Sequence, residues 1–281
     1  MSQYKFNRDH IKQSDMIGGY GAGKVLVAKQ LREDLKEIYF DGVEDFFYQA
    51  QDNITPMVSI LKETFQTLWD DTRTDFTWTL PNGFRCHLKP VETVEITVNP
   101  FGQFPISMIA KAVAPSSRNT RLGVSIIHSC DGYVADEMVV RCNYNPDALL
   151  RTLVLVDEFL MMNPNHVATG YYDIISASVI ERLDEEDLLN FTLDQLYTIR
   201  ARCIKSLDYK PFPVKPIHDG FASHPNHDEV KCRIYSEIMA EITDGHLLES
   251  IIMQLSGKPM ARIQGDLTGQ MVRKHSKYAI C

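Results

Sequence analysis

A short segment with the character of β-strands interrupts a sequence that otherwise shows helical spacing. Residues Phe76 to Leu80 alternate as a strand does, Pro81 to Gly83 has the composition of a turn, and Val91 to Val98 is rich in β-branched residues. Apolar residues before and after this segment recur at helical spacing. The sequence therefore predicts an α+β fold that contains more helix than strand.

Five long segments are predicted to be helical: residues 8–38, 40–70, 146–162, 184–206 and 229–242. The apolar run from Val124 to His128 indicates a strand end before a turn at Asp131 and Gly132, with a helix following from Val134 to Val140. The three prolines of residues 210–216 favour an extended chain there.

The 281-residue chain has a net charge of −8 that is unevenly distributed. Residues 1–30 hold five basic and two acidic residues, residues 255–281 hold five and one, and the stretch between them holds 19 and 34. The net charge argues against a nucleic-acid-binding protein, whereas the basic ends favour one. The hydrophobic fraction of 44% and the charged fraction of 23% exclude a disordered, fibrous or coiled-coil chain.

The cysteines and the apolar runs indicate where the chain functions. Its six cysteines include no Cys-x-x-Cys pair, which favours reduced thiols over a disulfide framework or a zinc site. No apolar run reaches the roughly 18 residues that a membrane helix needs, and residues 1–15 are too polar for a secretory signal. We therefore expect a cytoplasmic protein.

The first candidate site lies near the N-terminus. Four residues recur at intervals of four and are followed by Gly21: Arg8, Lys12, Met16 and Tyr20. On a helix, such residues share one face, where Arg and Lys could hold a triphosphate beside the phenol of Tyr20. The same spacing also fits a solvated basic face.

A glycine cluster in the same region, residues 18–23, offers an alternative interpretation as a phosphate-binding P-loop. Lys24 follows the cluster as a P-loop lysine does. However, Val25 stands where a P-loop has Ser or Thr, and no apolar strand precedes the cluster. The P-loop is therefore the weaker alternative.

The second candidate site is a His-Asp pair, His218 and Asp219, within the short segment 217–221. A carboxylate presented in a tight strand–turn–strand can bind a hard cation such as Mg²⁺. The nearby His224 and His227 raise the alternative of a transition-metal site, although the Pro-Asn between them favours a surface loop.

The third candidate site is the His-Ser-Cys-Asp-Gly sequence of residues 128–132. A histidine at a strand end can reach a ligand, so His128 is a candidate binding residue. A nucleophilic pair of His128 and Cys130 is an alternative, but residues two apart usually point in different directions.

Together these segments resemble the single-subunit RNA polymerases of bacteriophage and mitochondrial type. The stripe from Arg8 to Gly21 is similar to that family's motif B helix, residues 217–221 to its motif C hairpin, and residues 128–132 to its His-Ser-x-Asp-Gly element. Residues 78–90 resemble its Trp-x-x-Pro-x-Gly-Phe strand and turn, and residues 278–281 its closing aromatic-Ala-aromatic-Ala. All five stand in the family's order. The related family A DNA polymerases usually have Phe at the position of Met16 and Glu at the position of Gly220.

The resemblance implies part of a right-hand polymerase fold, with a fingers portion in residues 1–125 and a palm portion in residues 126–281. It implies two-metal nucleotidyl transfer, in which the RNA 3′-hydroxyl attacks the α-phosphate and pyrophosphate leaves. It also implies a role for each site residue: Arg8 and Lys12 bind the incoming triphosphate, Tyr20 checks the ribose, Gly21 admits the template, His128 contacts the nascent pair or the ribose, and Asp219 binds Mg²⁺ with support from His218.

Two departures from the family change what this resemblance implies. No motif A, which supplies the second metal-binding carboxylate, is present in the sequence. Either the sequence is a fragment of a longer polymerase, or the enzyme is split and another polypeptide supplies motif A. We expect the second, with a partner polypeptide that carries motif A, the N-terminal domain and the thumb, acting with DNA template, nascent RNA and NTPs in the cytoplasm of an infected host cell. Residues 143–208 read as a helical insertion whose acidic character suits docking. The alternative is a non-catalytic polymerase-like subunit that binds template or a partner.

Overall fold

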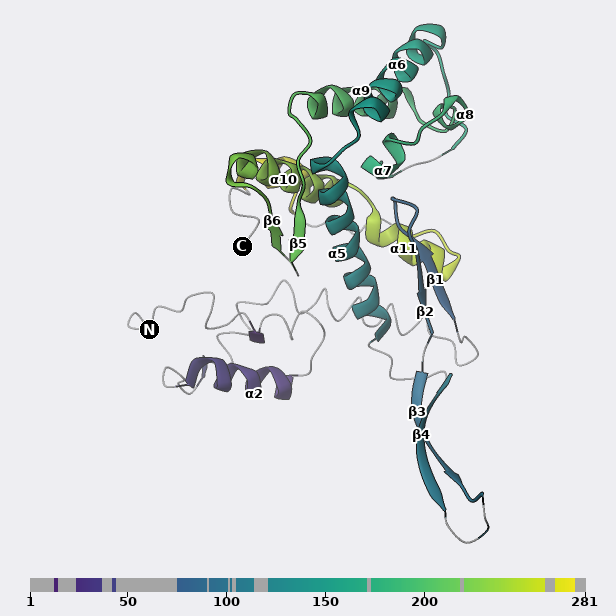
Figure 1. Cartoon of the computed structure of the whole chain (residues 1–281), viewed down its shortest axis with the longest axis vertical. Helices are drawn as coiled ribbons and strands as arrows, with labels where there is room; N and C mark the ends of the chain where they lie inside the picture. The colour runs from purple at the N-terminus through teal and green to yellow at the C-terminus, as the bar shows by residue number, and fades with distance from the viewer. Residues whose placement is uncertain are drawn as a thin grey trace. The chain divides into compact units, whose positions relative to one another are not determined.

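The computed structural model describes residues 13–14, 24–36, 42–43, 75–89, 91–100, 102, 105–113, 121–170, 173–217, 220–260 and 266–275. Within them, helices predominate and are accompanied by three two-stranded sheets (Figure 1). The predicted helix-rich α+β class is therefore confirmed. The chain divides into two compact units, residues 1–76 with 88–127 and residues 77–87 with 128–281.

Helix α2, Lys24–Leu35, belongs to the first unit and buries one stripe of side chains. Val27, Leu31 and Leu35 recur every four residues and are all buried, as an amphipathic helix requires. This confirms the predicted helix 8–38 over the part that is described. The predicted helix 40–70 lies outside the described residues apart from residues 42–43.

Strands β3, Val91–Val98, and β4, Ile106–Val113, form an antiparallel hairpin in which Val91 pairs with Val113 and Val98 with Ile106. The predicted strand 91–98 is confirmed. Because successive side chains of a strand point to opposite faces, this register places a set of apolar residues on one face. They are Val94, Ile96, Val98, Ile106 and Met108, and each is between 38% and 52% exposed.

Strands β1, Phe76–Thr79, and β2, Arg85–Leu88, are joined by the turn expected at residues 81–83. Gly83 has a φ of +85°, which glycine adopts without the steric cost that other residues have. Its N–H donates to Leu80 O at 2.8 Å and so closes the turn. The strand and the turn predicted in this segment are both confirmed.

Helix α5, Arg121–Cys142, runs without interruption through residues 128–132. The predicted strand end and turn in this segment are therefore wrong. Gly132 is a turn signal in sequence, but buried side chains on both sides of it, including Ile126 and Tyr133, hold the chain in one helix. The packing of these neighbours outweighs the local preference of a single glycine, which amounts to roughly 1 kcal/mol.

Four helices follow within residues 143–208: α6, Pro146–Met162; α7, Ala177–Ile180; α8, Glu185–Leu188; and α9, Leu193–Leu207. The predicted helix 146–162 is confirmed. The single helix predicted over 184–206 is wrong, because Thr192 and Gln195 form a reciprocal capping box that starts α9 as a separate helix.

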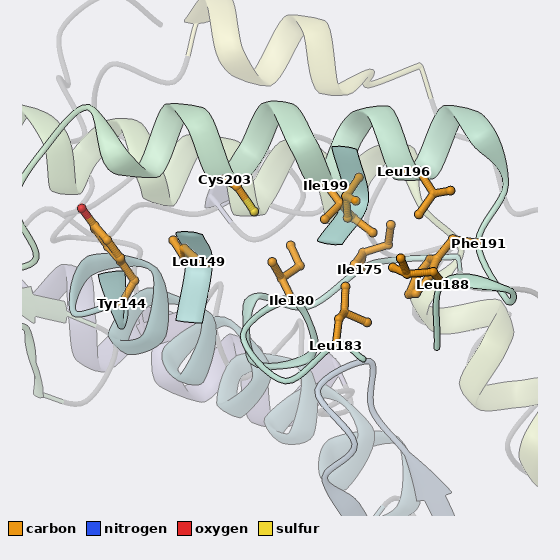
Figure 2. Close-up of a cluster of buried hydrophobic side chains, with 11 residues drawn as sticks. Tyr144, Leu149, Ile175, Ile180, Leu183, Leu188, Phe191, Leu196, Ile199 and Cys203 are labelled. Carbon is orange, nitrogen blue, oxygen red and sulfur yellow. The ribbon is translucent and has the colours of Figure 1, made fainter. Parts of the chain in front are cut away.

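These four helices surround a hydrophobic cluster of their own. Figure 2 shows Leu196, Ile199 and Cys203 of α9 facing Leu149, Ile180 and Leu183 across it. All of its buried members lie between residues 144 and 203: Tyr144, Leu149, Val156, Ile175, Ile180, Leu183, Leu188, Phe191, Leu196, Ile199 and Cys203. Segment 143–208 therefore has the apolar core that a locally folded unit needs.

The remaining elements of the second unit follow α9 along the chain. They are β5, Lys215–Ile217; β6, Gly220–Ala222; the short helix η2, Pro225–His227; α10, Asp228–Asp244; α11, Leu247–Ser256; and α12, Gly269–His275. The predicted helix 229–242 is confirmed by α10, and β5 agrees with the extended chain predicted over 210–216. In the part of the chain that the structure describes, no helix is long and apolar enough to cross a membrane.

A second hydrophobic cluster joins α5 to these later elements. Its buried members are Met138, Cys142, Phe212, Val214, Phe221, Ile234 and Ile238. The backbone N–H of Phe212 donates to Cys142 O at 2.8 Å, so the chain returns to the end of α5 after segment 143–208. None of the buried members of this cluster belongs to that segment.

Candidate functional site

Most of the predicted site residues lie outside the described residues. These are Arg8, Lys12, Met16, Tyr20, Gly21, His218 and Asp219. Their roles stay predictions. His128 is described, and it is an exposed residue near the middle of α5.

Segment 128–132, which contains His128, contacts segment 78–87. Trp78 Nε1, on β1, donates to Ser129 Oγ at 3.0 Å. Asn82 Nδ2, in the β1–β2 turn, donates to Asp136 Oδ2 at 2.8 Å. The β1–β2 hairpin is therefore held along α5 on both sides of Gly132.

Segment 217–221 is anchored to the same helix through the second hydrophobic cluster. Strands β5 and β6 pair antiparallel, and the last pair of the ladder is Ile217 with Gly220. The two residues that connect this pair, His218 and Asp219, lie outside the described residues. Phe221 of β6 packs in one cluster with Met138 of α5, so the base of the hairpin is fixed against the helix that carries His128.

The structure argues against a nucleophilic pair of Cys130 and His128. Both residues lie on α5 two positions apart, which places their side chains about 200° apart around the helix. Burial, together with the charge of Asp131 and the thiol of Cys86, raises the pKa of Cys130 to about 11. The thiol is therefore protonated at neutral pH and is a poor nucleophile.

The histidines that raised a transition-metal site serve structural purposes. The ring of His227 stacks on Phe212, with centroids 4.3 Å apart and an angle of 3° between the planes. His224 Nδ1 accepts from the N–H of Asn226 at 3.3 Å and caps η2. Among the described residues, no group of three or more His, Cys, Asp or Glu side chains could hold a metal ion.

The P-loop alternative concerns residues 18–23, which lie outside the described residues. Lys24 begins α2, and Val25 is 87% exposed. An exposed valine offers no hydroxyl for magnesium at the position where a P-loop supplies Ser or Thr. The described part of the segment therefore adds nothing in favour of a P-loop.

A buried charge network that the sequence did not reveal lies at the end of α5. Arg141 Nε donates to Glu137 Oε2 at 2.7 Å, and its Nη1 and Nη2 donate to Glu241 at 3.0 and 2.6 Å. Arg202 Nη2 lies 2.7 Å from Glu241 Oε1. The network thereby links α5, α9 and α10.

Burial and pairing act in opposite directions on the pKa values of this network. For Glu241, burial favours the protonated acid, but Arg141 and Arg202 outweigh it and lower the pKa below its ordinary value. For Arg141, burial favours the neutral form, but the two carboxylates raise the pKa overall. Both groups are therefore charged at neutral pH. The four-residue spacing of Glu137 and Arg141 was the one sequence signal of this network.

No protein-family model and no curated protein matches the chain. Within the second unit, segment 128–132 is part of α5, segment 78–87 contacts this helix at Ser129, and segment 217–221 packs in one cluster with Met138 of the same helix. An assignment of function therefore rests on the chemistry of these segments and on their arrangement along this helix.

Proposed function

We propose that this chain is one subunit of a phage-type DNA-directed RNA polymerase, which adds NTPs to an RNA 3′ end in the cytoplasm of an infected host cell. One observation carries the proposal. The segments 78–87, 128–132 and 217–221 are far apart in sequence, yet they belong to one compact unit, in which the second is part of α5 and the other two pack on that helix. This supports the proposal, because the segments of one polymerase site have to be held by one folded unit.

Each predicted site residue of this chain has its own role in the proposed reaction. Arg8 and Lys12 hold the incoming triphosphate, Tyr20 checks the 2′-hydroxyl of the ribose, and Gly21 leaves room for the template. His128, which is exposed on α5, contacts the nascent pair or the ribose. His218 supports Asp219 in the connection between β5 and β6.

Asp219 is the residue of this chain that would hold Mg²⁺. A carboxylate is the hard oxygen ligand that Mg²⁺ prefers, so the residue type fits the metal. Bound metal would stabilise the charge on the attacking and leaving oxygens of the phosphoryl group. A two-metal centre needs a second carboxylate, and we propose that the partner polypeptide supplies it with motif A.

The β3–β4 hairpin supports the proposal that the chain works in a larger assembly. Its face of Val94, Ile96, Val98, Ile106 and Met108 is exposed in this chain. A two-stranded hairpin is marginally stable in water on its own, and contiguous exposed apolar side chains are typical of interfaces. A partner that covers this face would remove both problems.

The proposal is tested by Asp219→Asn in the complex of this chain with its co-purifying partner. RNA synthesis on a melted or single-stranded template is expected to fall at least about a hundredfold, because a metal ligand contributes several kcal/mol to the reaction. Assembly should be unchanged. The matched control is Asp208→Asn, an exposed aspartate at the end of α9. Full activity of the Asp219 variant, in a complex that makes RNA, would overturn the catalytic role.

The second candidate function is a non-catalytic polymerase-like subunit that binds template or a partner. The absence of motif A from the sequence favours it. It predicts that Asp219→Asn and Asp208→Asn behave alike in transcription, and that each retains binding. The same experiment therefore separates the two functions.

A further inference from the structure

A cavity of about 280 Å³ lies between α9 on one side and α10 and α12 on the other. Five cationic side chains line it: Arg141, Arg202, Lys205, Arg233 and Arg273. Two carboxylates, Glu237 and Glu241, line it as well. In a chain with a net charge of −8, this cavity is a local concentration of positive charge.

Both carboxylates of the cavity are already shared between two cations. Glu241 contacts Arg141 and Arg202. Glu237 accepts from Lys205 Nζ at 2.8 Å through Oε1 and from Arg273 Nε at 2.8 Å through Oε2. All four carboxylate oxygens thus have cationic partners, and neither group is left to neutralise a further charge.

Two acidic groups outside the lining reduce the excess but do not remove it. Glu137 accepts a hydrogen bond from Arg141 Nε, and Asp244 Oδ2 lies 3.6 Å from Arg273 Nη1. Among the described residues, the total is then four carboxylates against five cations. Arg233 is the cation of this set that forms no ion pair with another described residue.

The ionisation of Arg202 agrees with this shortage of negative charge. Burial lowers its pKa, and the neighbouring Arg141 lowers it further, while Glu241 and Glu137 only partly compensate. A guanidinium whose pKa is lowered is stabilised when an anion enters its surroundings. The planar fork of Arg233 and the neighbouring guanidinium groups match the geometry of phosphate oxygens.

We propose that this cavity binds a small phosphate-bearing anion, held by Arg233 together with Arg202 and Arg273. Its volume is close to the lower limit for small-molecule sites, which suits inorganic phosphate, pyrophosphate or the phosphate end of a nucleotide. The anion bridges α9 to α10 and α12, and so stabilises the packing of segment 143–208 on the helices that follow it. This inference does not rest on the proposed polymerase function.

The test is thermal unfolding of the full chain with phosphate, pyrophosphate or ATP, each compared with chloride at equal ionic strength. At a hundredfold excess over Kd, the midpoint should be about 5 °C higher than in chloride, and it should go on rising with the logarithm of the anion concentration. Arg233→Gln removes an exposed side chain and should keep the fold, yet weaken the affinity roughly tenfold. The ligand with the highest affinity identifies the source of the phosphate group.

Arg85→Gln is the matched control, because it removes an exposed arginine on β2 of the same unit outside the cavity. Its affinity should equal that of the unmodified chain, and Arg233→Lys should restore part of the lost affinity. The proposal is overturned if none of the three anions raises the midpoint above its value in chloride. Equal shifts in Arg233→Gln and Arg85→Gln would also overturn it, because they would show a general ion effect.

Discussion

Glu137 is the residue whose removal should damage the second unit most. It is fully buried on α5, and four donors point at its carboxylate: Arg141 Nε and Nη2, the hydroxyl of Ser176 and the N–H of Ala177. Ser176 and Ala177 begin α7 within segment 143–208. We expect Glu137→Gln to loosen this segment from α5.

The size of the effect is set by the groups that the substitution leaves behind. Glutamine has nearly the shape of glutamate but has no charge. Its NH2 group donates hydrogen bonds and cannot accept one from the donors that surround Glu137. Arg141 then keeps only Glu241, which it shares with Arg202. Breaking one side of a buried pair costs about 3–5 kcal/mol, so we expect a loss of about that size in the free energy of unfolding.

The assay is urea unfolding followed by far-UV circular dichroism, together with amide hydrogen exchange. The N–H of Ala177, which donates to Glu137 Oε1 at 3.0 Å, should exchange faster in the variant. The control is Glu158→Gln, which removes an exposed carboxylate from α6 and should change the free energy by less than about 0.5 kcal/mol. A loss below about 1 kcal/mol for Glu137→Gln would refute the reasoning, because it would mean that the carboxylate is not needed by its donors.

Three further variants test local features. Gly132→Ala should stabilise α5 by roughly 0.5–1 kcal/mol in thermal unfolding, because a Cβ added there meets nothing within 4 Å. Thr192→Ala should cost about 1 kcal/mol in urea unfolding, since it removes the hydroxyl that accepts from Gln195 N. The pKa of Glu241 is lowered below the ordinary value of a glutamate, so its contribution to stability is present at neutral pH and is lost as the pH falls through the lowered pKa. Glu241→Gln should therefore reduce stability at pH 7 and flatten the decline of stability in acid.

The sequence predicted those helices and turns whose first or last residues have a local preference for that position. Helix α6 begins where Asn145 accepts from the N–H groups of Asp147 and Ala148, and Pro146 occupies the first helical position. The β1–β2 turn contains Gly83 where a positive φ is needed. These signals are local, so they can be interpreted without knowing the fold.

The prediction failed where a local signal and distant packing disagree. Asp131 and Gly132 indicate a turn, but α5 continues through them because its flanking residues are buried. The contact of Trp78 with Ser129 joins residues 51 positions apart, and the Arg141–Glu241 pair joins residues 100 positions apart. Neither separation corresponds to a helix or strand period, so only the fold could reveal these contacts.

The two hydrophobic clusters of the second unit are joined by Tyr209, which packs against both, and by polar groups. Tyr209 OH donates to Arg141 O at 2.7 Å, and Arg202 and Lys205 of α9 pair with Glu241 and Glu237 of α10. Charge pairs weaken with salt and with protonation, whereas apolar contacts depend far less on either. Protonation of Glu241 should therefore weaken the attachment of segment 143–208, and an anion bound in the cavity should strengthen it, while the apolar contacts of Tyr209 are unaffected by either.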